Sequence, residues 1–140
     1  MNAVEKELSG NDTGETGGHQ AGMLIPRGGE ILKFFPALGR DTKNPRTVIY
    51  VVDETGKEWS FNFIYYNNKF FGGTRNEYRL TGMTEFIRSF NLKTGDVLVL
   101  EKVSDRLTRI RYRRKDRTSP GGALKLGVGG WRVVDYSEED

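Results

Sequence analysis

The sequence lacks residue types on which many catalytic and metal-binding sites depend. Its 140 residues contain no cysteine and a single histidine, His19. Without cysteine there is neither a disulfide framework nor a thiolate metal site, and one histidine cannot complete a zinc site. His19 alone, in a glycine-rich segment, is typical of a solvent-exposed side chain. The absence of cysteine fits a reducing environment, so we expect a cytoplasmic protein without a metal site.

Long apolar runs are also absent. No stretch approaches the ~20 consecutive apolar residues that a membrane helix needs. The first residues, Met1–Leu8, lack the apolar core of a signal peptide. The glycine-rich segment Ser9–Gly22 does not contain the Gly-x-x-x-x-Gly-Lys-Ser/Thr pattern of a nucleotide-phosphate loop. We therefore expect neither a membrane partner nor a nucleotide cofactor.

Candidate catalytic residues are few. The segment Asp41-Thr42-Lys43 matches the acid-x-lysine element of metal-dependent nucleases. It lies in a polar stretch that ends in Asn44-Pro45, and no apolar strand precedes it. A small metal-dependent nuclease that uses Asp41 and Lys43 is therefore the least favoured interpretation, and we expect no catalytic residues in this chain.

Charge is distributed unevenly along the chain. The net charge is +3, but residues 101–117 contain eight basic and three acidic residues, a local net charge of +5. A basic stripe attracts a polyanion more strongly than the mean charge indicates. Within the expected strand, Arg109 and Arg111 lie on one face, where they could contact phosphates. A solvated sheet face would carry the same pattern, so both interpretations stay open.

The pattern of turns and apolar residues predicts a mainly β protein. A tight turn at residues 54–57 joins two strands, Thr47–Asp53 and Glu58–Tyr66, into a hairpin with one buried face. The other expected elements are strands at Val97–Val103 and Leu107–Tyr112, with short helices at Gly28–Pro36 and Thr84–Phe90. Phe70–Leu80 is expected to be a further strand or a strand pair interrupted by the charged tip. Met1–Leu8 is compatible with a short helix or an unstructured lead, and Ser9–Gly22 with a loop. Such short strands and helices predict a small barrel whose loops form the working surfaces.

The last part of the chain differs from the rest. We expect one domain over residues 1–117, followed by a Gly-rich linker or tail over residues 118–140. Ala123–Val128 and Trp131–Tyr136 could form a terminal strand pair across Gly129-Gly130. Alternatively, this tail could dock on the barrel.

The stretch Gly72–Thr81, G-G-T-R-N-E-Y-R-L-T, concentrates side chains that can read DNA. Arginine can bind guanine with two hydrogen bonds, asparagine can do the same with adenine, and glutamate accepts from the cytosine amino group. Arg75, Glu77 and Arg79 alternate, so in an extended segment their side chains would share one face. A solvated, charged hairpin would also have this composition, because short motifs match by chance often.

Three features together favour recognition of a DNA duplex. They are the small polar residues of Ser9–Gly22, the charged tip Arg75–Arg79, and the arginine row that includes Arg109 and Arg111. Phosphate contacts position a protein on DNA, whereas base contacts specify the sequence. A chain that offers both kinds of contact predicts sequence-specific binding to double-stranded DNA.

Two blocks resemble the N-terminal effector domains of EcoRII-type restriction endonucleases. The first is L-S-G-N-D-T-G-E-T-G-G-H-Q-A-G at Leu8–Gly22, and the second is I-Y-Y-N-N-K-F-F-G-G-T-R-N-E-Y-R-L-T at Ile64–Thr81. A third block, Phe86–Lys102, is similar to the helix-turn-strand of plant B3 DNA-binding domains, which belong to the same pseudobarrel family. The resemblance spans roughly Leu8 to Tyr112. It implies an open seven-stranded pseudobarrel with two short α-helices.

The resemblance also implies a mode of binding. Family members grip the major groove with two arms, which here correspond to Ser9–His19 and Arg75–Thr81. The DNA-binding residues that it implies are Lys6, Ser9, Asn11, Asp12, Thr13, His19, Arg75, Asn76, Glu77, Tyr78, Arg79 and Thr81. The EcoRII-type domain carries lysines at the positions of Gly73 and Tyr78, so their absence predicts a lower overall affinity more than a changed sequence preference.

The same resemblance suggests a target and a parent protein. The implied target is similar to CC(A/T)GG, and the domain is expected to bind as a monomer without a cofactor. We expect the chain to be the N-terminal piece of a type II restriction endonuclease, with Mg²⁺ needed only by a nuclease domain that is not in this chain. The alternative is a stand-alone DNA-binding regulatory domain.

Overall fold

The computed structural model describes residues 2–15, 22–115 and 129–135. Eight strands form one sheet in the order β2-β5-β4-β3-β7-β6-β1-β8, in which β3 and β7 run parallel and the other pairs antiparallel. The strands are β1 (Asn2–Glu7), β2 (Met23–Ile25), β3 (Arg46–Val52), β4 (Glu58–Tyr66), β5 (Glu77–Thr81), β6 (Val97–Ser104), β7 (Leu107–Arg113) and β8 (Trp131–Asp135). The helices are α1 (Gly10–Thr13), α2 (Gly29–Phe34), the 3-10 helix η1 (Asn68–Phe71) and α3 (Thr84–Ser89).

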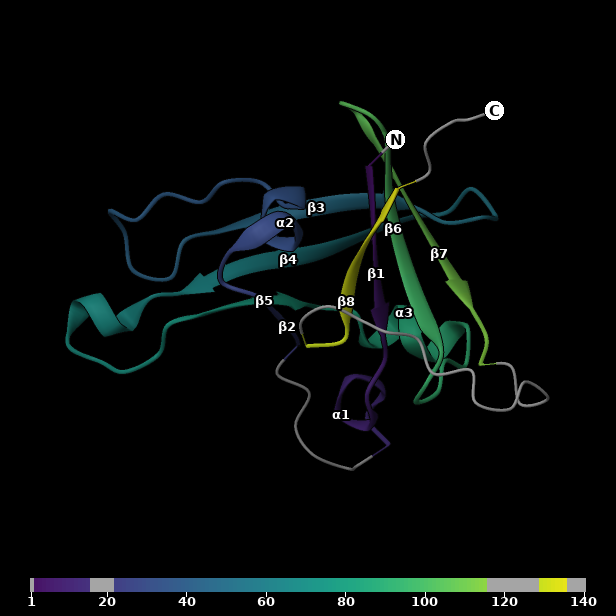
Figure 1. The fold of residues 1–140 in the computed structure, drawn as a ribbon, viewed down its shortest axis with the longest axis horizontal. Coiled ribbons are helices and arrows are strands. Elements are labelled where there is room, and N and C mark those ends of the chain that lie inside the picture. The colour runs from purple at the N-terminus through teal and green to yellow at the C-terminus, as the bar shows by residue number, and fades with distance from the viewer. Residues whose placement is uncertain (1, 16–21, 116–128, 136–140) are drawn as a thin grey trace.

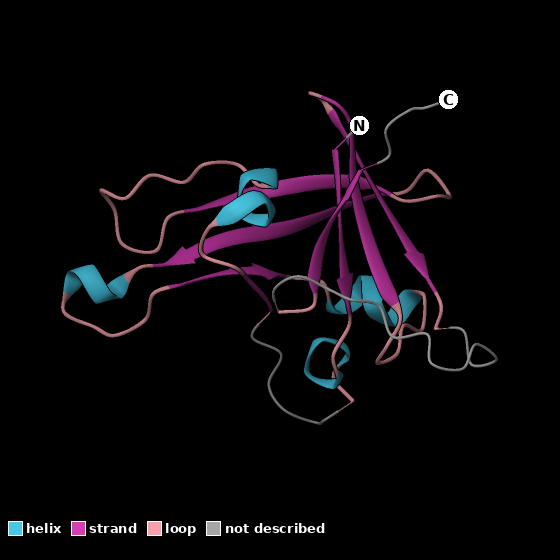
Figure 2. Ribbon diagram, viewed as in Figure 1, coloured by secondary structure: helices cyan, strands magenta, loops and turns pink. Residues whose placement is uncertain are grey.

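The sheet curls into a nearly closed barrel. In Figure 1 the strands β3, β4 and β5 cross the strands β1, β6, β7 and β8 at a steep angle. Figure 2 shows that strands dominate and that the helices are short. This arrangement confirms the predicted mainly β pseudobarrel. No helix in the described part of the chain is long and apolar enough to cross a membrane.

The described residues form eight strands, not the predicted seven. Residues 2–7, expected as a helix or an unstructured lead, form β1 between β6 and β8. Residues 131–135 form β8 and pair with β1, so the sheet continues beyond residue 117. For these residues the tail docks on the barrel, while Ala123–Val128 lies outside the described residues.

Two other segments differ in detail from the expectation. The segment 70–80 is a strand only from Glu77, because η1 and a turn take up its first part. The segment 9–22, expected as a loop, begins with the single helical turn α1. Helices α2 and α3 lie within the predicted ranges, and both strands of the hairpin are confirmed.

The hairpin β3–β4 shows why the chain folds this way. From Glu58 to Phe63, exposed and buried residues alternate along β4, as expected for a strand with one face on the core. Asp53 closes the turn, because its carboxylate accepts hydrogen bonds from the Thr55 hydroxyl at 2.6 Å and from the Trp59 indole at 2.8 Å. Burial raises the pKa of Asp53, but the hydrogen bonds from Thr55, Trp59 and Lys57 outweigh this effect and lower the pKa to about 2.

Aromatic side chains fill the barrel. Phe61, Phe63, Phe86 and Trp131 are at most 1% exposed. Phe86 of α3 packs edge-on against Trp59 at 5.2 Å between ring centroids, which holds α3 against β4. Burying large aromatic side chains is the main source of stability in a domain of this size.

A side chain from the end of the described chain joins the two edges of the sheet. The strands β2 and β8 are the two ends of the strand order, and no backbone pairing joins them among the described residues. The indole Nε1 of Trp131 on β8 donates to the carbonyl of Leu24 on β2 at 2.9 Å. Trp131 is fully buried and also packs edge-on against Phe35. The side chain of Trp131 therefore connects the two edges of the nearly closed barrel.

Candidate nucleic-acid interface

Strand β5 carries polar side chains on one face. Tyr78 and Leu80 are buried, whereas Glu77, Arg79 and Thr81 are half-buried on the opposite face. This alternation follows from the two-residue period of a strand. It confirms that Glu77 and Arg79 share a face, as their spacing in the sequence predicted.

Tyr78, which the resemblance placed among the DNA-binding residues, lies in the core. Its ring stacks on Tyr65 at 4.1 Å and on Phe63 at 5.6 Å between centroids. Burial raises the pKa of its hydroxyl. A tyrosine at this position packs the arm onto the barrel, where a lysine would have to leave the core.

Glu77 is held between two arginines. Its Oε2 accepts a hydrogen bond from Arg75 Nη2 and another from Arg79 Nε, both at 2.7 Å. The hydrogen bond from Arg75 lowers the pKa of Glu77, and the second arginine lowers it further. The side chains of Arg75, Glu77 and Arg79 are 42%, 27% and 19% exposed. The cluster is thus preformed and still accessible from solvent.

The backbone of this arm is fixed by hydrogen bonds around η1. Asn68 Oδ1 accepts from the Arg75 amide at 2.6 Å, and the Lys69 amide donates to the Arg75 carbonyl at 2.9 Å. Gly73 approaches Asn68 so closely that a Cβ at Gly73 would lie 2.8 Å from Asn68 Cγ. A side chain could be accommodated at this position only if Asn68 moved.

Further amide side chains tie the arm to the barrel. The Tyr65 hydroxyl donates to Asn76 Oδ1 at 2.6 Å, so the amide nitrogen of Asn76 remains as its donor group. Asn67, which is 1% exposed, accepts from the Asn44 amide at 2.7 Å and donates to the Thr42 carbonyl at 3.0 Å. The arm is therefore held by neutral polar contacts, while its charged groups remain at the surface.

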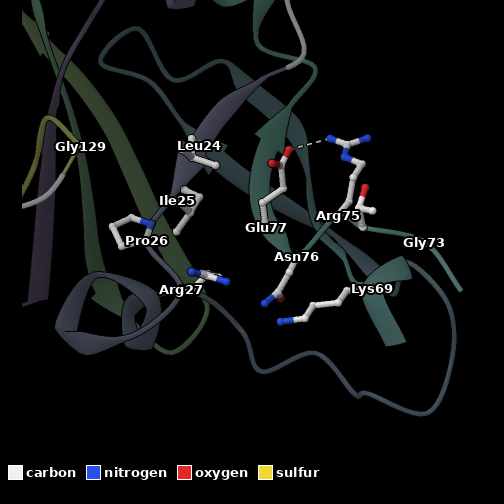
Figure 3. A pocket seen from close by; sticks show the side chains of 11 residues that line it. Leu24, Ile25, Pro26, Arg27, Lys69, Gly73, Arg75, Asn76, Glu77 and Gly129 are labelled. Atoms are coloured by element: carbon white, nitrogen blue, oxygen red, sulfur yellow. Dashed lines mark hydrogen bonds and ion pairs between the residues drawn. The ribbon is translucent and has the colours of Figure 1, made fainter. Parts of the chain in front are cut away.

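A cleft of about 800 Å³ opens beside the arm. One wall is formed by β2 and the residues after it, and the other by residues 73–77 (Figure 3). In this view the ends of Arg27, Asn76 and Lys69 come together at one end of the cleft, and Glu77 binds Arg75 at the other. Arg27 and Lys69 are exposed, and no acidic partner is found for either among the described residues. Sequence reasoning missed these two cations, because only the fold brings them to the cleft.

The first arm is described only from Ser9 to Glu15, and His19 lies outside the described residues. Ser9 caps α1: its Oγ accepts from the Asp12 amide, and Asp12 Oδ2 accepts from the Ser9 amide. Asn11 is exposed and Thr13 is half-buried. Ser9, Asn11 and Thr13 therefore present small polar groups near the surface of a short, capped turn.

Lys6 and Asp12 are buried and bind each other. Lys6 Nζ lies 2.8 Å from Asp12 Oδ2, with side chains that are 7% and 6% exposed. Lys6 Nζ also donates to the Glu7 carbonyl at 3.0 Å. Both residues were expected at the DNA, but here they fasten α1 to β1, and a contact with DNA would require this pair to open.

The second arm contacts the chain at the start of β2. Arg79 Nη1 donates to the carbonyl of Gly22 at 2.9 Å, where the chain enters β2. Gly22 has a φ of 91°, and a Cβ there would lie 2.6 Å from Thr81 Cγ2. Only glycine fits this approach of the first segment to β5. One arginine therefore links the charged cluster to the base of the first arm.

Arg109 and Arg111, the expected phosphate contacts, lie on β7. Strands β4 and β3 separate β7 from β5 in the sheet. Arg109 is exposed, while Arg111 Nη2 binds Glu101 at 3.1 Å. The next arginine in the row, Arg113, binds the buried Glu5 through both terminal nitrogens, at 2.5 and 3.1 Å. The arginine row is thus partly engaged in holding the sheet together.

The nuclease alternative gains no support from the geometry. Asp41 and Lys43 are exposed in the segment before β3. Within the described ranges, no group of three or more His, Cys, Asp or Glu side chains could hold a metal ion.

Comparison with known proteins identifies relatives of two kinds. The model of the family described as "Restriction endonuclease EcoRII, N-terminal" matches residues 2–108. The type II restriction enzyme EcoRII of Escherichia coli is 40% identical over 98 residues, which are 68% of this chain and 24% of that enzyme. A B3 domain-containing protein of Oryza sativa subsp. japonica is 31% identical over 99 residues, 71% of this chain and 9% of that protein.

Two further matches extend the comparison. The B3 domain-containing transcription repressor VAL1 of Arabidopsis thaliana is 28% identical over 123 residues, 88% of this chain and 12% of that protein. A solved structure described as "Arabidopsis FUS3-DNA complex" matches with a TM-score of 0.60 and 21% identity, and covers 80% of this chain and 96% of that chain.

The fold places the molecule among the B3-like pseudobarrel domains. Within that class, the chain belongs to the family of EcoRII N-terminal domains. The matched region spans about a quarter of the E. coli enzyme.

Proposed function

We propose that this domain recognises a specific sequence in double-stranded DNA and reads base edges in the major groove with the Arg75–Glu77–Arg79 cluster. The observation that carries the proposal is the preformed, accessible cluster formed by Arg75 with Glu77 and Arg79 of β5. Membership of the EcoRII N-terminal family supports it. So does the resemblance in fold to a protein solved in complex with DNA.

The cluster suits a run of G·C pairs. Each arginine has donors left for a guanine, because Arg75 uses Nη2 and Arg79 uses Nε and Nη1 for contacts within the protein. Both bonds to Glu77 end on Oε2, and no partner for Oε1 is found among the described residues. That oxygen is available to accept from a cytosine amino group. The resemblance to EcoRII-type domains leads us to propose a target similar to CC(A/T)GG, and the cluster is compatible with its G·C pairs.

Other residues would position the duplex. Arg27 and Lys69 are suited to phosphates at one end of the cleft, and Ser9, Asn11, Thr13 and His19 would contact DNA from the first arm. Asn76 would act as a donor, since its oxygen is occupied by Tyr65. Arg109 and Arg111 remain proposed phosphate contacts outside the cleft.

We further propose that the domain acts as a monomeric recognition part of a type II restriction endonuclease. It needs no cofactor for binding, and Mg²⁺ would serve a nuclease domain outside this chain. A stand-alone regulatory domain is the second candidate, favoured by the match of 88% of this chain to a B3 transcription repressor. The complete reading frame separates the two, because only the first requires a nuclease domain.

A competition assay tests the base readout. The duplex CC(A/T)GG competes with single-base variants for binding to the wild type and to Glu77→Ala. We expect Glu77→Ala to lose about 1–3 kcal/mol of discrimination at one base pair, while binding to unrelated duplexes stays equal or improves. Glu30→Ala, which removes an exposed partner of Lys33 that does not line the cleft, is the matched control.

A simple electrostatic patch predicts a different result. Removing a carboxylate from such a patch would tighten binding to every duplex equally. Uniform tightening across all variants would reject base readout by Glu77. Cleavage of the duplex in the presence of Mg²⁺ that disappears in Asp41→Ala would reject the binding function in favour of a nuclease.

A further inference from the structure

Tyr66 forms a platform under one of the candidate reading arginines. It is the last residue of β4, and its register partner on β5 is Glu77. Arg75 Cζ lies 3.8 Å from the centroid of the Tyr66 ring. At this distance the flat guanidinium is in contact with the face of the ring, which attracts it electrostatically.

A guanidinium carbon only 3.8 Å above a ring centroid fits best with the flat face of the group toward the ring, which leaves its edge accessible. The N–H donors of arginine lie in the plane of the guanidinium, so a ring beneath that plane takes none of them. Glu77 takes one of these donors through Nη2 at 2.7 Å. The ring therefore fixes the plane of the group, and Glu77 fixes its rotation within that plane.

We propose that Tyr66 is a positioning residue that orients Arg75 for two hydrogen bonds to one guanine, and so contributes to sequence specificity without touching DNA. The inference rests on the proposed function, because it needs a duplex partner. Bidentate contacts require a defined plane, and a long side chain that is 42% exposed does not hold one unaided. The backbone hydrogen bond from Arg75 to Asn68 places the start of the side chain, and Tyr66 places its end.

The test uses duplexes in which each guanine in turn is replaced by 7-deazaguanine, which lacks the N7 acceptor. In the wild type, a guanine read by an arginine should show an affinity loss of about 5- to 150-fold on this replacement. Arg75 reads the guanine whose replacement by 7-deazaguanine lowers the affinity of the wild type but no longer lowers the affinity of Arg75→Ala.

The informative variant is Tyr66→Leu. In this variant, 7-deazaguanine at the position read by Arg75 should cost at most about half of the affinity that it costs in the wild type, because the contribution of the ring contact is lost. The affinity losses at the other guanines should persist. Tyr66→Phe keeps the aromatic face and should behave as the wild type. Tyr112→Leu is the matched control, because Tyr112 lies beneath Arg114 at 5.0 Å, outside the cleft.

Several outcomes would overturn the proposal. An unchanged loss at the guanine of Arg75 in Tyr66→Leu would reject it while leaving the proposed function intact. An equal reduction at every guanine would assign Tyr66 a general structural role. Duplex binding without any loss at any guanine would reject guanine readout itself, and the proposed function with it.

A measurement on the wild type covers the case in which Tyr66→Leu does not fold. A side chain stacked on a tyrosine is shielded by the ring current, so the δ-methylene protons of Arg75 should resonate upfield of those of Arg27 in the NMR spectrum of the free domain. Shifts in the ordinary range would show that the stacking is absent in solution and would overturn the proposal.

Discussion

The two arms contain the same kind of ion pair but use it in opposite ways. In the first arm, Asp12 binds Lys6 of β1; these side chains are 6% and 7% exposed, and the pair fastens α1 to β1. In the second arm, Arg75 and Glu77 are 42% and 27% exposed and face the cleft. A buried pair is costly to break, because the partner left behind is an uncompensated charge. An exposed pair contributes little to stability, so its groups can be exchanged for those of a ligand.

The difference assigns separate tasks to the two sets of charges. The first arm uses its charges for shape, and leaves small polar groups such as Ser9 and Asn11 at the surface. The second arm takes its shape from asparagines and buried tyrosines, and leaves its charges at the surface. Substitutions in the two arms should therefore affect stability and binding in different proportions.

The largest effect is expected from Asp12→Ala. It leaves Lys6 charged and buried without its partner, so the free energy of unfolding should fall by about 3–5 kcal/mol, as measured by urea denaturation. Glu30→Ala breaks the ion pair between Glu30 and Lys33, whose side chains are 72% and 74% exposed. This variant should change the free energy of unfolding by less than about 0.5 kcal/mol. Similar small losses for both variants would refute the contrast between the arms.

A smaller effect should separate the two arginines of the second arm. Arg79→Ala removes the bond to the Gly22 carbonyl as well as that to Glu77, and should cost about 1–3 kcal/mol of stability. Arg75→Ala should cost no more than about 0.5 kcal/mol, while it lowers specific DNA affinity. Thermal unfolding and duplex binding of both variants check this. An Arg75→Ala domain that unfolds would make the tip structural and the site assignment wrong.

Salt dependence compares the cleft with the arginine row. With ~4–6 phosphate contacts, the logarithm of the binding constant should fall with the logarithm of salt concentration at a slope of roughly −4 to −5. Replacing Arg27 and Lys69 by alanine should make the slope less steep by about 2. Replacing Arg109 and Arg111 should reduce it less, because Arg111 is engaged by Glu101. No change for the second pair would assign it to a solvated face, and a flat slope for the wild type would exclude a duplex partner.

The smallest effect concerns the pKa of Glu77. Its pKa is lowered from 4.5, so its contribution to stability is present above 4.5 and is lost as the pH falls through the lowered value. NMR titration of the carboxyl carbon should give a midpoint below 4.5, and Arg75→Ala should raise it. Glu15 is the control: hydrogen bonds from Thr94 and Thr13 lower its pKa to about 2, independently of Arg75. If Arg75→Ala leaves the titration midpoint of Glu77 unchanged, Arg75 does not bind Glu77 in solution as the cluster requires.

The parts of the fold that were predictable have local causes. The hairpin β3–β4 is encoded by β-branched and aromatic residues around a tight turn, and the shared face of Glu77 and Arg79 by the period of a strand. Strand β1 was missed because Glu5 and Lys6 are charged. They are buried only through Arg113, Arg132 and Asp12, which are distant in sequence or belong to another element.

The candidate site was predictable to a similar degree. The alternation of residues 75–79 indicated the cluster, but the contributions of Tyr66, Arg27 and Lys69 depend on how separate elements meet. Tyr78 looked like a surface residue of a charged motif, yet strand periodicity places it on the face opposite to Glu77 and Arg79. Lys6 and Asp12 suit a polyanion by type, and only the fold shows that each satisfies the other.

The tryptophan that closes the barrel also provides an optical probe. The chain has two tryptophans, Trp59 and Trp131, and both are buried. In a Trp59→Phe domain, the emission would come from Trp131 alone, at the contact between β8 and the carbonyl of Leu24. Its wavelength and quenching would report whether β2 and β8 stay together. Because β2 lies soon after the first arm in the sequence, the same signal would show whether adding a DNA duplex separates β2 from β8.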